Sequence, residues 1–152
     1  WHIVGDGSNY QNCLDLTQKL ALQDKVTFYG RRPLEDMPAY YAMADALLVS
    51  MRNDISVNDT LPGKVQSYMA AGKPVLGSIG GETAYVVEKA GCGFCSAPDD
   101  PQAFADTVRR FLAHPDPAQL GLNGSRYYHQ HFTKKHHMDQ LESMLQGLAG
   151  GK

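Results

Sequence analysis

The fold is decided by the stretch Asn58-Asp59-Thr60-Leu61-Pro62-Gly63-Lys64-Val65-Gln66-Ser67-Tyr68-Met69-Ala70-Ala71-Gly72-Lys73-Pro74-Val75. It predicts a polar loop, a short helix over 62–71, and a tight turn into a buried strand over 74–79. Pro62 suits the first helical position, because the N–H that proline lacks would have no partner there. Gly72 suits the residue just past the helix, where a left-handed backbone is unstrained for glycine. A strand tolerates a proline such as Pro74 at its start.

The loop that enters this helix is a candidate anion site. A helix N-terminus carries free N–H groups and a partial positive charge, and phosphate is a frequent ligand there. Gly63 allows a ligand to approach the backbone closely, and Lys64 adds a formal charge beside it. The alternative is an ordinary strand–loop–helix connection with a solvated lysine. The pattern alone leaves both open, because an anion motif without a full fingerprint is a weak signal.

Strands and helices alternate along the whole chain. Apolar runs predict strands over 2–5, 25–30, 46–51, 74–79 and 93–97, and helical spacing predicts helices over 8–22, 34–44, 62–71, 82–90, from Asp100 onward, 117–132 and 134–148. This alternation predicts one three-layer, Rossmann-like α/β domain over 1–148, with a parallel sheet and helices on both faces, and a frayed tail over 149–152.

Several buried faces are predicted from the same spacing. The continuous apolar run 46–51 is typical of a strand covered on both faces. The helix over 34–44 is expected to tolerate Pro38 in its first turn. The expected inward residues of that helix are Leu34, Met37, Tyr41 and Ala44. The apolar stripe of the helix after Asp100 consists of Phe104, Val108, Phe111 and Leu112, and the last helix has Met138, Leu141, Leu145 and Leu148 on one side.

Ligands of such sheets bind beyond the carboxyl ends of the strands. The loops at those ends are 5–8, 30–33, 51–61 and 78–82. We therefore expect Arg31, Asp59, Lys64 and Glu82 to lie along one edge of the sheet.

Composition excludes several classes of protein. The 152 residues suffice for one core, and the net charge of −2 gives no basic footprint for nucleic acid. The apolar runs are too short to span a membrane. Three cysteines do not make an even disulfide framework, which favours a reducing, cytoplasmic setting. The chain opens on Trp1, directly in a predicted strand, so we expect a piece of a longer protein.

Three motifs resemble known functional sites, for a dinucleotide, for redox chemistry and for a metal, but lack features that such sites require. Gly5-Asp6-Gly7 begins a dinucleotide fingerprint, but the third glycine would fall at Tyr10. Cys92-Gly-Phe-Cys95 precedes an extended stretch and does not open a helix, so we interpret both cysteines as small packing residues. The histidines at 129, 131, 136 and 137 do not share a helix face, which is poor geometry for a metal site.

A family resemblance rests on Leu61–Val75 together with Gly80-Gly81-Glu82-Thr83-Ala84 and Ala90-Gly-Cys-Gly-Phe94. These segments resemble the nucleotide-sugar-binding half of GT-B fold glycosyltransferases, closest to the retaining polysaccharide-biosynthesis enzymes of glycosyltransferase family four. The resemblance extends from Ile3 to about Phe132. It implies the C-terminal, donor-binding domain, without its first strand and helix, of a parent that moves a sugar from a nucleoside diphosphate sugar to a glycan or lipid-linked acceptor.

The resemblance also implies partners and cofactors. The partner is an N-terminal acceptor domain of the same parent, so the fragment is expected to be inactive alone. The donor is the only small molecule required, a UDP-sugar is favoured, and no metal is needed. The parent is expected in the cytoplasm or peripherally at the inner face of the membrane.

The site residues follow from a Glu-x₇-Glu motif of the resembled family, whose first acid contacts the donor sugar and whose second holds the ribose. Counting back from Gly72 places Asp59 and Ser67 at these positions, so the second carboxylate is replaced by a hydroxyl. Gly63 and Lys64 correspond to the diphosphate contacts, and Gly30 and Arg31 to the contacts with the base. Thr60, Leu61 and Glu82 complete the substrate-binding candidates.

Alternatives stay open for these residues and for the function. Asp59 also fits a turn, Arg31 a solvated loop, and Glu82 the cap of its own helix. Ser67 is also consistent with a degenerate, non-catalytic binding or scaffold module. Half of a GT-B-like sugar-nucleotide epimerase would share the architecture.

Overall fold

The computed structural model describes residues 1–52 and 60–150. Asp59, the predicted donor-sugar contact, lies outside the described residues. The chain divides into two compact units, Trp1–Tyr40 and Tyr41–Lys152. No helix within the described ranges is long and apolar enough to cross a membrane.

The first unit is built on a parallel strand pair. Strand β1 (His2–Val4) pairs with β2 (Thr27–Gly30), and α1 (Tyr10–Lys19) connects them. Tyr10 of α1 meets Phe28 of β2 edge to face, with ring centroids 5.6 Å apart. Helix α1 is shorter than the predicted 8–22, because Ala21 adopts a left-handed backbone (φ 53°) that ends it. A short turn of 3₁₀ helix (Leu34–Asp36) then leads into α2 (Met37–Met43), with Pro38 in its first turn as predicted.

The second unit holds a three-stranded parallel sheet in the order β3-β4-β5. Its strands are β3 (Leu47–Ser50), β4 (Val75–Ser78) and β5 (Gly93–Ser96), and its helices are α4 (Gly63–Ala70), α5 (Gly81–Ala90), α6 (Pro101–Leu112), α7 (Pro117–His131) and α8 (Lys134–Gly150). Parallel strands joined by helices confirm the predicted α/β class.

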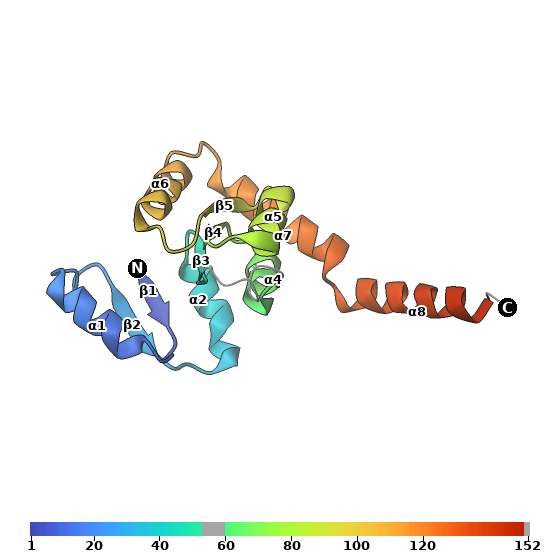
Figure 1. The fold of residues 1–152 in the computed structure, drawn as a ribbon, viewed down its shortest axis with the longest axis horizontal. Coiled ribbons are helices and arrows are strands. Elements are labelled where there is room, and N and C mark those ends of the chain that lie inside the picture. The colour runs from blue at the N-terminus through green and yellow to red at the C-terminus, as the bar shows by residue number, and fades with distance from the viewer. Residues whose placement is uncertain (53–59, 151–152) are drawn as a thin grey trace. The chain divides into compact units, whose positions relative to one another are not determined.

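Two apolar clusters lie on the two faces of this sheet. Val75 of β4 packs with Val65 and Met69 of α4 and with Val87 of α5, whereas the neighbouring Leu76 packs with Phe111 of α6. Successive strand residues point to opposite faces, so β4 contributes to both clusters. Figure 1 accordingly shows α6 on one side of the strands and α4 and α5 on the other. The helices on both faces agree with the predicted layering.

The predicted ends of the central helices are largely confirmed. Gly72 and Gly91 both have left-handed backbones (φ 66° and 59°) just beyond α4 and α5. Asp100 caps α6 by accepting a 2.9 Å hydrogen bond from the Ala103 N–H. Pro62, in contrast, is the cap residue of α4 and not its first helical residue, because its extended ψ of 138° keeps it outside the helix. Helix α8 continues through Gly150, past the predicted end at Leu148.

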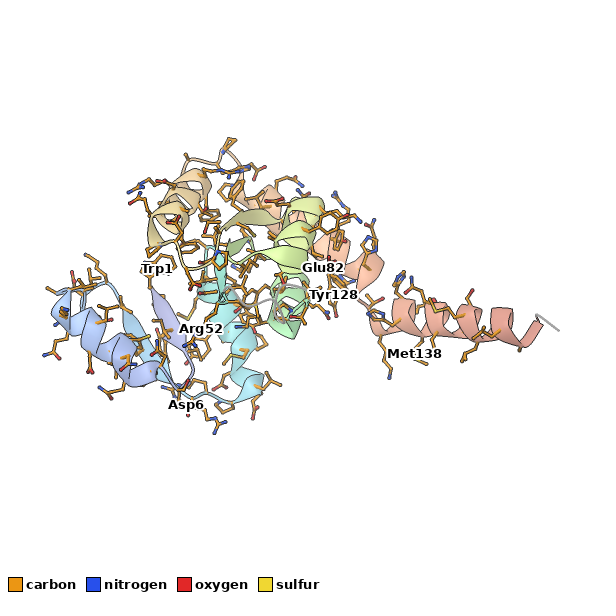
Figure 2. All side chains as sticks on the ribbon, in the orientation of Figure 1. Trp1, Asp6, Arg52, Glu82, Tyr128 and Met138 are labelled. Atoms are coloured by element: carbon orange, nitrogen blue, oxygen red, sulfur yellow. The ribbon has the colours of Figure 1, made fainter. Side chains whose placement is uncertain are left out.

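Other expectations were wrong. Leu34 is 82 % exposed and Leu112 is 74 % exposed, because each lies at the end of its helix, beyond the elements that cover the rest of the predicted face. Leu48 of β3 is 39 % exposed, and Val49 is the buried residue of that strand, so β3 is not covered on both faces. The apolar side of α8, for which the sequence predicted a shared face but no covering element, is exposed from Met138 (Figure 2) to Leu148. The described hydrogen bonds join the strands in two parallel sheets, β1-β2 and β3-β4-β5.

Candidate functional site

The candidate site in the second unit begins where β3 and β4 end. The Met51 N–H donates a 3.1 Å hydrogen bond to the Ser78 carbonyl, which holds the two strand ends together. The chain after β3 leads to the N-terminus of α4, and the chain after β4 leads to the N-terminus of α5. Both helices therefore start at the carboxyl edge of the sheet, where the topology predicts ligand binding.

Neither helix start has a side chain that can cap it from the cap position. Pro62 precedes α4 and Gly80 precedes α5, and neither makes a side-chain cap hydrogen bond. Two other helices of this unit differ, because α6 and α7 are capped by the carboxylates of Asp100 and Asp116. Gly63 and Lys64 are exposed in the first turn of α4. This turn can therefore offer backbone N–H groups and one positive charge to an anion.

The first turn of α5 contributes groups of a different kind. Glu82 is exposed there (Figure 2) and places a carboxylate near the positive end of the helix dipole. Thr83 is 2 % exposed, and its hydroxyl donates a 2.8 Å hydrogen bond to the Thr60 carbonyl. This hydrogen bond connects two of the predicted site segments: the one before α4, which contains Thr60, and the one that leads into α5 and ends at Glu82.

Ser67 lies one turn into α4. Its side chain is exposed, and its hydroxyl donates a 3.2 Å hydrogen bond to the Gly63 carbonyl. The oxygen can still accept a hydrogen bond from a ligand hydroxyl, but a single hydroxyl cannot hold two ribose hydroxyls as a carboxylate can. Leu61, by contrast, is partly buried and packs against the core cluster of α4. Its side chain supports the loop from the inside.

The first unit brings together two other predicted loops. The Gly5 N–H donates a 2.8 Å hydrogen bond to the Gly30 carbonyl, and Asp6 (Figure 2) lies 3.9 Å from the Arg31 Nε. Both charged side chains are more than half exposed, so this ion pair contributes little to stability. No sequence motif predicts that Asp6 lies beside Arg31. That Arg31 lies along the same edge as Lys64 stays a prediction.

Three ionisable side chains elsewhere in the second unit, Cys92, Cys95 and Tyr68, have pKa values raised by burial, which favours their neutral forms. Burial raises the pKa of the Cys92 thiol to about 12, and burial also raises the pKa of the Cys95 thiol to about 12, with a smaller contribution from Glu88. Burial and the nearby Tyr41 raise the pKa of Tyr68. Thiols with such pKa values are poor nucleophiles, which agrees with a packing role for the cysteine pair. Across the described residues, no group of three or more His, Cys, Asp or Glu side chains is arranged to hold a metal ion.

Sequence reasoning missed Thr83 as part of this site. Thr83, Val86 and Val87 are the buried residues of α5, so the Thr83 side chain lies on the inner face of the helix. The acceptor of its hydroxyl, however, lies 23 positions away in the chain and has no local signal.

Comparisons with known proteins agree with this arrangement. The profile of the family described as glycosyl transferases group 1 matches residues 1–126. The chain belongs to this family. The resemblance predicted from Leu61–Val75 and the segments after it is thereby confirmed.

Two curated relatives show how much of a full-length enzyme the chain represents. The 2-deoxystreptamine glucosyltransferase of Streptomyces kanamyceticus is 30 % identical over 124 residues, covering 82 % of this chain and 31 % of the relative. The probable glycosyltransferase WbjE of Pseudomonas aeruginosa is 31 % identical over 123 residues, covering 78 % of this chain and 29 % of the relative. The chain therefore spans about a third of the length of these two relatives.

Solved structures of GT-B glycosyltransferases share the fold. Sucrose-phosphate synthase from Thermosynechococcus elongatus superposes with a TM-score of 0.80 at 25 % identity, over 99 % of this chain and 39 % of that one. Anabaena Alr3699/HepE in complex with UDP superposes with a TM-score of 0.81 at 22 % identity, over 96 % of this chain and 40 % of that one. This chain thus has the Rossmann-like fold of the C-terminal domain of GT-B enzymes.

Proposed function

We propose that this chain is the donor-binding domain of a retaining glycosyltransferase that moves a sugar from a nucleoside diphosphate sugar to a glycan or lipid-linked acceptor. The observation that carries the proposal is the start of α4, where Gly63 and Lys64 are exposed without a capping carboxylate at the carboxyl edge of the sheet. A diphosphate bound there would meet backbone N–H groups, the positive end of the helix dipole and one ammonium group.

In this proposal, α4 does two things for the reaction. It holds the diphosphate of the donor in the ground state, and it stabilises the negative charge that grows on the diphosphate as the bond to the sugar breaks. No metal is needed for this, because fixed N–H dipoles and Lys64 supply the positive potential. Ser67 would form one hydrogen bond with a ribose hydroxyl. Gly30 and Arg31 would contact the base, and Asp59 would contact the donor sugar.

UDP is the nucleotide to test first. Alr3699/HepE, which shares the fold, was solved with UDP and with UDP-glucose. The acceptor site and its acid–base groups belong, in this proposal, to an N-terminal domain of the parent, so the chain by itself binds the donor and transfers nothing. The parent would work in the cytoplasm or at the inner face of the membrane.

The charge of Lys64 provides a direct test. We expect Lys64→Gln to weaken UDP binding about tenfold, because one ammonium–phosphate contact is lost. The matched control is Lys89→Gln, since Lys89 is equally a surface lysine but lies in the last turn of α5, over the Tyr85 ring. Titration calorimetry of both variants checks this, and equal UDP affinities for Lys64→Gln and wild type would count against a diphosphate at α4.

A degenerate scaffold module is the second candidate, and Ser67 is the observation that favours it. Ser67→Glu separates the two functions, because Ser67 is exposed and its replacement needs no repacking. Tighter UDP-sugar binding by Ser67→Glu would show an intact pocket that the serine only tunes. Absence of binding by both wild type and Ser67→Glu would favour the scaffold.

A further inference from the structure

Thr83 is the one buried polar side chain that joins the two helix starts in the described part of the site. It is 2 % exposed in the first turn of α5, and its hydroxyl donates to the Thr60 carbonyl at 2.8 Å. Thr60 itself is three residues ahead of Gly63, the first residue of α4. The hydrogen bond therefore fixes the chain immediately before the first turn of α4.

The direction of this hydroxyl is unlike that of two other helical threonines, Thr17 and Thr107. Thr17 and Thr107 donate to the carbonyls of Cys13 and Ala103, four residues earlier in their own helices, at 2.8 and 3.0 Å. Such bonds are the common choice for a helical threonine and leave the rest of the fold untouched. Thr83 instead reaches a segment 23 positions away. A buried hydroxyl needs a partner, and here the partner is the loop that enters α4.

Little freedom remains between the bond and the helix. Only Leu61 and Pro62 separate Thr60 from Gly63; Leu61 packs against the core cluster, and Pro62 has its φ fixed by its ring. The Pro62 carbonyl in turn accepts a 2.9 Å hydrogen bond from the Val65 N–H. The Thr83 hydroxyl, the Leu61 contact and the Pro62 ring together define the path of the backbone into the first turn.

We propose that Thr83 is a positioning residue of the donor site, whose hydroxyl holds the Thr60–Gly63 backbone in the conformation that presents the first turn of α4 to a diphosphate. This inference rests on the proposed function. Thr83 does not touch the donor; it acts through the Thr60 carbonyl. Without the hydroxyl, the loop samples other conformations, and the apparent affinity falls in proportion to the population of the competent one.

Thr83→Val is the test variant, because valine has the shape of threonine and suits a stripe that already contains Val86 and Val87. We expect about tenfold weaker UDP binding by the 152-residue chain, corresponding to a binding-competent population reduced to about a tenth. Amide hydrogen exchange at Val65 should also become about tenfold faster, since its bond to Pro62 reports the order of the loop.

Thr107→Val is the matched control. Thr107 is also a buried threonine, 3 % exposed, but its hydroxyl bonds within α6. We expect its UDP affinity and its Val65 exchange to equal those of wild type. Thr83→Ser should rescue both properties, because it keeps the hydroxyl. If Thr83→Val does not fold, Thr83→Ser and Thr83→Ala replace it, since both lack the methyl group and only serine has the hydroxyl.

The outcomes separate the inference from the function on which it rests. Unchanged UDP affinity in Thr83→Val, or an equal loss in Thr83→Val and Thr107→Val, would overturn the positioning role and leave the donor site standing. Failure of the folded wild-type chain to bind UDP would overturn the proposed function, and the donor role of Thr83 with it. Weaker binding confined to Thr83→Val and Thr83→Ala, with rescue by Thr83→Ser, supports both.

Discussion

Replacing Gly121 with alanine should destabilise the protein, although alanine is the better helix former. Gly121 lies inside α7, and a Cβ built there would stand 2.1 Å from the Gly72 carbonyl oxygen and 2.9 Å from its carbon. Both atoms are backbone, in the left-handed turn that ends α4 and leads into β4. Because a backbone cannot swing aside as a flexible side chain can, α7 must move away from α4 to accommodate a methyl group.

The magnitude follows from two opposing effects. Helix propensity favours alanine over glycine by about 1 kcal/mol. Overpacking against a rigid neighbour costs about 3 kcal/mol, the upper part of its usual range, because the contact is far inside van der Waals distance. The expected net loss is about 2 kcal/mol, which corresponds to a fall in Tm of about 6 °C for a chain of this length.

Gly147 provides the control for this prediction. It lies inside α8, and nothing stands within 4 Å of a Cβ built there. Gly147→Ala should therefore stabilise the protein or leave it unchanged. Urea unfolding of wild type and both variants measures the free energies. A Gly121→Ala variant as stable as wild type would refute the close packing of α7 on the Gly72 turn.

Two further predictions concern groups outside the candidate site. Lys73→Met should cost about 1 kcal/mol in urea unfolding, because the Lys73 ammonium donates to the carbonyls of Ala42 and Ala44 at 3.0 and 2.7 Å, where α2 ends; an unchanged midpoint would show that these bonds contribute nothing. The raised pKa values of Cys92 and Cys95, about 12 against a usual value of 9.0, predict an alkaline loss of stability. Since the unfolded thiols ionise first, this stability is complete below about pH 9 and declines toward pH 12. Thermal melts across that range should show a smaller alkaline decline in Cys95→Ala, and an identical decline would contradict the assignment.

Much of the fold was predictable because its signals are local. The left-handed glycines at 72 and 91 and the Asp100 cap each act within a few residues, and the structure has all three. The alternation of strands and helices follows equally from short-range patterns.

The errors arise where local patterns do not specify what covers a surface. Helical periodicity places Leu34, Leu112 and the apolar residues of α8 on helix faces that can be buried. Whether they are buried depends on which element packs there. Lys64 could be identified as a site candidate because its signal lies in the adjacent residues of the sequence. The Thr83–Thr60 hydrogen bond could not, because no local pattern indicates it. A hydroxyl acceptor 23 positions away is a property of the tertiary fold.

The proposed function depends most on the binding of a nucleotide at the start of α4. An NMR titration of the 152-residue chain with UDP, GDP and NAD in separate samples tests this directly. We predict shifts on UDP, or on GDP if guanine is the base, confined to Gly30–Arg32 and Thr60–Ser67. Shifts on NAD alone, or nucleotide shifts that leave Gly63 and Lys64 unchanged, would contradict the central claim.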